Sequence, residues 1–158
     1  MKNTTRLLHL IGLVMFLGSI LPFIAMNAFV GASTDALLIF HQRQFVSVVT
    51  WSLTVPGMWI LVIAGGMTAF AGKYRLVEYR WLAAKLVLAI LILINGTFFI
   101  APLVDQVTSI AEQSAVQGQL LPTYLPLKAK EDIFGMANFL MILIAIFLAI
   151  FKPGFRRV

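Results

Sequence analysis

Four apolar stretches, each long enough to cross a lipid bilayer, constrain the fold of this chain more than any other feature. A membrane-spanning helix needs about 20 predominantly apolar residues, and the stretches at about 6–30, 45–71, 81–104 and 133–151 meet this length. Of all residues, 61% are hydrophobic and 11% are charged, whereas soluble domains carry about 25% charged residues. The sequence therefore predicts an all-α polytopic membrane protein, a single four-transmembrane-helix bundle formed by residues 1–158.

The charges that flank these spans predict the orientation of the bundle. Four crossings place both termini and the middle loop on one side, which carries one acid, Glu78, and eight basic residues: Lys2, Arg6, Lys73, Arg75, Arg80, Lys152, Arg156 and Arg157. The other side carries three basic residues against five acids. Because cytoplasmic loops carry the excess of Lys and Arg, we expect a bacterial-type cytoplasmic (inner) membrane with both termini in the cytoplasm. The basic residues flank spans and form no patch, so the net charge of +6 does not indicate nucleic acid as a partner.

The segments on the outer side carry helix signals. Residues 33–35 are candidate N-caps, so the second helix is expected to begin early. The outer loop, about 105–132, begins as a polar continuation of the third helix that ends at Gly118. Pro122 and Pro126 are expected to keep this loop non-helical until the last span begins.

One histidine and one lysine lie inside the predicted spans. At a rise of 1.5 Å per residue, Lys85 lies about 7–8 Å inward of Arg80, and His9 lies about 4–5 Å inward of Arg6. Both therefore occupy one layer in the cytoplasmic half of the membrane. A lysine costs about 2.5–3.5 kcal/mol at the bilayer centre on insertion scales. Lys85 can avoid this cost by extending its ammonium to the headgroups, or it can face His9 across a bound cofactor.

The inner half of the second span contains small residues at a spacing of four. Ala64, Thr68 and Gly72 form one row, and Gly65 and Ala69 form another. This spacing lets a second helix pack closely, or it lets a flat macrocycle lie against the backbone. Helix packing alone is the commoner explanation of the two.

Several chemistries are excluded by what the sequence lacks. There is no cysteine, so thiolate metal sites and cysteine nucleophiles are absent. No Asp or Glu lies inside the predicted spans, which argues against a proton-driven transporter with an acidic relay. His41 falls a bilayer away from His9, so ligation of one haem by two histidines is excluded as well.

Three features of the sequence recur together in a known superfamily. They are a histidine one turn into the first helix (RLLHLIGLVMFLGSILPF), a proline–methionine region in the second (TVPGMWILVIAGG) and a W-x-x-x-K opening of the third. In these features residues 6–104 resemble the small four-helix membrane proteins of the HemJ/CopD-like superfamily, most closely its uncharacterised family of predicted integral membrane proteins. HemJ-type protoporphyrinogen oxidases hold a b-type haem through that histidine and that lysine. The resemblance thus implies haem b as the cofactor, with His9 and Lys85 as axial ligands of its iron.

The resemblance also bears on the rest of the site and on the activity. The haem propionates are expected to pair with Arg6, Lys73, Arg75 or Arg80, and Gly65, one of the small residues of the second span, is expected to lie against the macrocycle. A lysine ligand must be neutral, and burial favours the neutral amine. Where HemJ-type proteins carry roughly LPRLFVYH at the end of the first helix, this chain carries LPFIAMNAF, so haem binding transfers better than porphyrinogen oxidation.

Two functions remain open on the sequence. The first is a membrane-embedded b-type haem protein with a redox role, either electron transfer or porphyrinogen oxidation of the HemJ type. The second is a cofactor-free structural or assembly subunit of a larger membrane complex, in which Lys85 snorkels and the small residues of the second helix form the docking surface. The lipid bilayer is the expected surrounding, and a homo-oligomer or a larger complex is the expected assembly.

Overall fold

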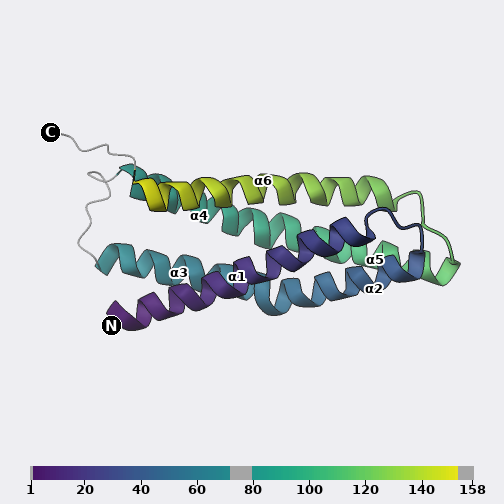
Figure 1. Ribbon diagram of the computed structural model, residues 1–158, viewed down its shortest axis with the longest axis horizontal. Helices are drawn as coiled ribbons and strands as arrows, with labels where there is room; N and C mark the ends of the chain where they lie inside the picture. The colour runs from purple at the N-terminus through teal and green to yellow at the C-terminus, as the bar shows by residue number, and fades with distance from the viewer. Residues whose placement is uncertain (1, 72–79, 153–158) are drawn as a thin grey trace.

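The fold consists of long helices that run side by side, as the computed structural model shows for residues 2–71 and 80–152 (Figure 1). The first helix is α1 (Lys2–Val30) and the last is α6 (Tyr124–Phe151). Between them lie two composite helices. One joins α2 (Ala36–Val49), the π-helical segment η1 (Thr50–Thr54) and α3 (Val55–Ala71). The other joins α4 (Arg80–Ile94), the π-helical segment η2 (Asn95–Ile100) and α5 (Ala101–Gln117).

The predicted all-α membrane fold is confirmed. Among the described residues there is no strand, and four helices are long and apolar enough to cross a membrane. The start of α1, the end of α3, the start of α4 and the end of α6 lie at one end of the bundle (Figure 1). This arrangement is the one that four successive crossings require. The prediction that this end faces the cytoplasm depends partly on charged residues that lie outside the described part of the chain: Lys73, Arg75, Glu78, Arg156 and Arg157. The orientation therefore stays a prediction.

Two helix ends follow the sequence signals closely. The Asp35 carboxylate accepts hydrogen bonds from the backbone amides of Leu37 at 2.9 Å and Leu38 at 3.2 Å, so it caps α2 as predicted. These bonds satisfy amides that have no partner within the helix. Gly118 has a φ of 70° and ends α5, as expected of a residue that adopts the left-handed conformation without strain.

The predicted outer loop is mostly helical. The third helix continues to Gln117, which confirms the predicted polar continuation that ends at Gly118. The last helix begins at Tyr124, earlier than the predicted span that starts at about 133, so only residues 118–123 separate the two helices. Pro122 lies between the helices as expected, but Pro126 lies in the first turn of α6. A proline is tolerated there because the amide that it lacks would have no partner within the helix.

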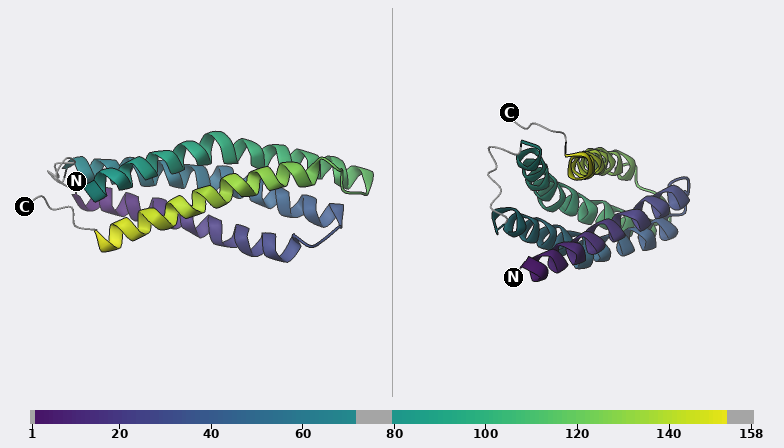
Figure 2. Two further views of the ribbon diagram at one scale, coloured as in Figure 1. Left: turned by 90° about the horizontal axis from the view of Figure 1, so that it is seen from above. Right: turned by 60° about the vertical axis from the view of Figure 1, so that its left-hand side comes forward.

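The helices are not packed evenly around the bundle. α1 packs mainly on α3, α2 packs on α5, and α6 packs on α4, η2 and α5. Within the described part of the chain, α1 and α6 make at most marginal contact with each other (Figure 2). We call this poorly packed boundary the α1–α6 seam.

Two glycines allow α1 and α3 to cross in close contact. A Cβ atom at Gly12 would lie 2.6 Å from the backbone nitrogen of Leu61, and one at Gly57 would lie 2.8 Å from the backbone nitrogen of Phe16. Only glycine fits at such a crossing, because the obstructing atoms belong to the opposite backbone.

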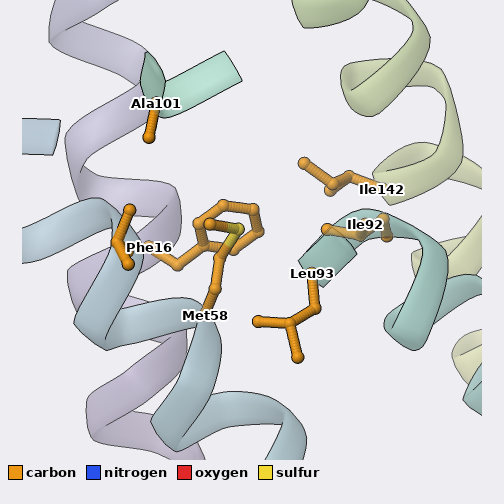
Figure 3. Packing of buried hydrophobic residues seen from close by; sticks show 7 residues of the cluster. Phe16, Met58, Ile92, Leu93, Ala101 and Ile142 are labelled. Atoms are coloured by element: carbon orange, nitrogen blue, oxygen red, sulfur yellow. The ribbon is translucent and has the colours of Figure 1, made fainter. Parts of the chain in front are cut away.

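A layer of large side chains fills the middle of the bundle. The phenyl ring of Phe16 and the thioether of Met58 lie together and face Ile142 on α6 (Figure 3). All three side chains are buried, at 3%, 2% and 6% exposed. This central layer divides the interior into two parts along the bundle axis.

A buried ion pair joins α2 to α6 on the side of the central layer away from the chain termini. Arg43 is 0% exposed, and its Nη1 and Nη2 donate to the two carboxylate oxygens of Glu131 at 3.2 and 2.6 Å. The sequence counted both residues only as charges on the outer side of the bundle, whereas the structure pairs them in its interior. The second helix begins at Ala36, early as expected, so Arg43 belongs to a packed helix.

Candidate cofactor site

The imidazole of His9 is held in one orientation by the backbone of α3. Its Nδ1 lies 3.0 Å from the carbonyl oxygen of Leu61. Because a carbonyl oxygen only accepts, Nδ1 must carry the proton, and in the neutral ring Nε2 then has a free lone pair. Metal-binding histidines commonly donate their second ring N–H to a carbonyl or carboxylate in this way. His9 therefore has the orientation and the tautomer of a ligand that binds through Nε2.

Gly65 forms the wall behind this imidazole. A Cβ atom at position 65 would lie 3.0 Å from Cε1 and 3.1 Å from Nδ1 of His9. The absence of a side chain thus leaves room for the ring beside α3. The spacing of small residues suggested a macrocycle against Gly65, whereas the structure places this glycine directly against the histidine.

His9 and Lys85 line the same cavity. It has a volume of about 260 Å³ and lies between α1, α3, α4 and α6. Lys85 reaches it from α4 and is half-buried. All other described residues that line this cofactor cavity are apolar or glycine. The two residues that the resemblance implies as ligands are thus the polar side chains of one apolar chamber.

The donor set and walls of this cavity are suited to haem. Imidazole is a common axial ligand of haem iron, and a neutral amine is a second nitrogen donor. The volume lies just below the usual range for ligand pockets, about 300–1,000 Å³. A macrocycle would have to widen the α1–α6 seam, where the helices pack least. Apolar side chains on all sides suit the flat face of a porphyrin.

Of the expected propionate partners, the structure describes the side chain of Arg6 alone. Arg6 is exposed on α1 and is not among the residues that line the cavity. The side chains of Lys73, Arg75 and Arg80 lie outside the part of the chain that the structure describes. His41 is exposed on α2, away from the cofactor cavity. The described residues also contain no group of three or more His, Cys, Asp or Glu that could hold a metal ion.

The carbonyl of Leu61 and the central layer next to it were not recognised from the sequence. A backbone carbonyl carries no signal in the residue type, so its role becomes visible only when the helices are placed. Met58 had a signal in the proline–methionine region, but nothing in the sequence placed it against Phe16.

Together, the four apolar helices and the apolar cavity between them define a polytopic integral membrane protein. Residues 3–153 match the family described as predicted integral membrane protein (DUF2269), and the chain belongs to this family. This agrees with the expected family of uncharacterised membrane proteins and with a lipid bilayer as the surrounding. The match does not extend to the HemJ/CopD-like superfamily, which remains a resemblance. Neither a curated protein nor a solved structure matches this chain.

Proposed function

We propose that this protein binds one b-type haem inside the membrane and has a redox role, with His9 and Lys85 as the axial ligands. The observation that carries the proposal is that these two side chains line one otherwise apolar cavity. They come from α1 and α4, which are separated by more than 70 positions in the sequence. The hydrogen bond between His9 and Leu61 adds independent support, because it leaves Nε2 available to iron.

In this proposal the chain's own residues orient the ligands and exclude water. The Leu61 carbonyl holds the imidazole, and Gly65 leaves room for the ring beside α3. Lys85 would bind iron as the uncharged amine, the only form with a lone pair. A bound haem would supply one-electron redox chemistry at a potential set by its axial ligands and by burial.

Electron transfer is the favoured activity within this proposal. The end of α1 carries no basic residue between positions 21 and 30. Substrate carboxylates therefore lack a partner on this stretch, where HemJ-type proteins carry arginine. Porphyrinogen oxidation is tested separately by adding protoporphyrinogen to the purified protein and comparing its oxidation with the spontaneous rate.

Absorption spectra of the purified protein test haem binding. We expect a Soret band with α and β bands on reduction, loss of the spectrum in His9→Ala, and a shifted spectrum in Lys85→Met. His41→Ala and Lys130→Ala are matched controls, because both residues are exposed and neither lines the cofactor cavity. A protein that is folded but colourless after expression with ample haem would overturn the proposal and favour the cofactor-free subunit.

A further inference from the structure

A second cavity lies beyond the central layer, next to the cofactor cavity. Its volume is about 510 Å³, within the range of about 300–1,000 Å³ that is typical of small-molecule sites. It is enclosed by α1, η1, η2, α6 and the adjoining turns of α2, α3 and α5. Phe16, Met58 and Ile142 line both cavities, so one layer of side chains separates them.

Two buried hydrogen-bond donors in this second cavity are unused. Thr50 is 4% exposed and Asn138 is 6% exposed, and both line the cavity. Asn95 donates to the Phe134 carbonyl at 3.1 Å and to Oδ1 of Asn138 at 3.3 Å, so the Asn138 amide is fixed with its NH₂ group free. Among the described residues, neither this NH₂ group nor the Thr50 hydroxyl donates a hydrogen bond. The fully buried donors without partners in the described part of the chain are Arg43 Nε and Thr97 Oγ1, so the Thr50 hydroxyl and the Asn138 NH₂ group remain accessible from the cavity. A ligand with acceptor atoms can therefore pair with them.

The carboxylates beside the cavity are already neutralised. Glu131 accepts both hydrogen bonds from the guanidinium of Arg43, and Asp132 accepts from the ammonium of Lys128. Each acid thus has its own basic partner. The cavity therefore favours an uncharged ligand over a cation or an anion.

Both π-helical segments of the described part of the chain form walls of this cavity. Thr50 and Thr54 belong to η1, whereas Gly96 and Ile100 belong to η2. Such single-turn π segments are rare and frequently occur at functional sites. A proline stands two residues after the end of each segment, Pro56 after η1 and Pro102 after η2. Proline lacks the backbone amide that a regular helix would use at that position.

The wall of the cavity along the α1–α6 seam is open to the exterior. Ile24 on α1 and Met136 on α6 line the cavity, yet they are 49% and 61% exposed. In a membrane this exterior is lipid. A ligand can therefore enter from the bilayer and leave an apolar tail in the seam.

We propose that the second cavity binds the head group of an isoprenoid quinone. A quinone is uncharged and dissolves in the bilayer, and its ring carries two carbonyl acceptors for the donors Thr50 and Asn138. Its tail would leave between Ile24 and Met136. The binding does not depend on haem in the cofactor cavity, although a quinone here would lie one side-chain layer from that cavity.

The test uses the full-length protein in nanodiscs of synthetic phosphatidylcholine, with decylubiquinone as the probe. Quinone that stays with the discs in excess of protein-free discs is extracted and quantified over a concentration series. We expect saturable binding near one quinone per chain. Thr50→Val removes one donor at nearly constant volume. Asn138→Leu removes the free NH₂ group with the same number of heavy atoms, and it also removes the acceptor of the Asn95 hydrogen bond. Each variant should weaken binding roughly 2- to 10-fold.

Three glycine variants provide a matched set of controls. A Cβ atom at Gly135, Gly66 or Gly18 meets no atom within 4 Å, so phenylalanine can begin at each position without a backbone clash. Gly135 lines the second cavity and Gly66 lines the cofactor cavity, whereas Gly18 is exposed and lines neither. Gly135→Phe should abolish quinone binding, and Gly66→Phe and Gly18→Phe should leave it unchanged. Circular dichroism checks that all three variants are helical.

Several results would overturn the quinone proposal. One is the absence of saturable binding to the wild-type protein, and another is binding that Gly135→Phe does not alter. Equal competition by decanol, which has the tail but no quinone ring, would show a site for acyl chains instead. Cross-linking of two chains through the seam would show that a second copy fills it. A colourless protein that binds decylubiquinone would refute the haem proposal alone, and a haem protein that does not bind it would refute this proposal alone.

Discussion

Removing one partner of the Arg43–Glu131 pair should destabilise the protein strongly. Arg43 is fully buried and donates two hydrogen bonds to Glu131, which is 8% exposed. Hydrogen bonds to charged groups contribute about 1.5–3 kcal/mol each, so the two bonds together account for about 3–6 kcal/mol. Loss of one member of a buried ion pair costs about 3–5 kcal/mol in other proteins. For Arg43→Met and for Glu131→Leu we expect a loss of about 4 kcal/mol in the free energy of unfolding.

The double variant should be far less destabilised than the sum of the two single variants. Arg43 Nε is buried without a hydrogen-bond partner among the described residues, so the wild-type pair is itself not fully satisfied. Replacing both residues by apolar side chains removes this cost together with the desolvation of two charges. Apolar replacement of a buried ion pair is often neutral or stabilising. Arg43→Met/Glu131→Leu should therefore lie within about 1 kcal/mol of the wild type.

Unfolding by sodium dodecyl sulfate from mixed micelles, followed by circular dichroism, measures these differences. Lys130→Leu is a control for the removal of a charge, because Lys130 is exposed one residue before Glu131. The reasoning is refuted if each single variant costs less than about 1 kcal/mol, the value of an exposed pair. It is also refuted if the effects of the two single variants add in the double variant, because additivity would show that the two side chains do not interact.

The packing and the site lead to three further predictions. Gly12→Ala should destabilise the protein by about 1–3 kcal/mol, because its Cβ atom would lie 2.6 Å from the backbone nitrogen of Leu61. Gly18→Ala, whose Cβ atom would meet open space, should stabilise the protein by about 0.5–1 kcal/mol, and the same unfolding assay distinguishes the two variants. Asp35→Asn should keep most of the cap on α2, whereas Asp35→Ala should lower the free energy of unfolding by about 1 kcal/mol. Equal losses of stability for the two variants in that assay would contradict the capping role of Asp35. Gly65→Ala should displace the His9 ring, because the Cε1 atom of the ring would lie 3.0 Å from the new Cβ atom. The proposed haem should then show an altered Soret band or be retained more weakly. An unchanged spectrum would contradict the placement of His9.

The sequence predicted the fold well because lipid leaves a chain few choices. Every backbone amide and carbonyl must be satisfied within the membrane, so an apolar stretch of sufficient length becomes a helix. Local signals were equally informative where one residue acts on its neighbours, as in the Asp35 cap and at Gly118. Pro126 misled the prediction because the same residue type can end a helix or occupy its first turn.

Contacts between distant residues were beyond the reach of the sequence pattern. Arg43 and Glu131 are separated by 88 positions, and each was counted only as a charge beside a span. The rise per residue did place His9 and Lys85 at one depth, and they line one cavity. Depth alone does not decide which way a side chain points around the helix, so the contact of His9 with Leu61 and Gly65 could not be predicted.

The uneven packing of the bundle explains why it retains two cavities. Apolar surfaces gain little by meeting each other in lipid, so close helix contacts in membranes depend on small residues and good fit. α1 and α3 have such a contact, since Gly12 and Gly57 bring the two backbones together. On the α6 side of the second cavity a glycine does not serve this purpose, because a Cβ atom at Gly135 would meet no atom within 4 Å. Both cavities lie against the α1–α6 seam, and it is therefore the natural route by which a membrane-dissolved ligand reaches either one.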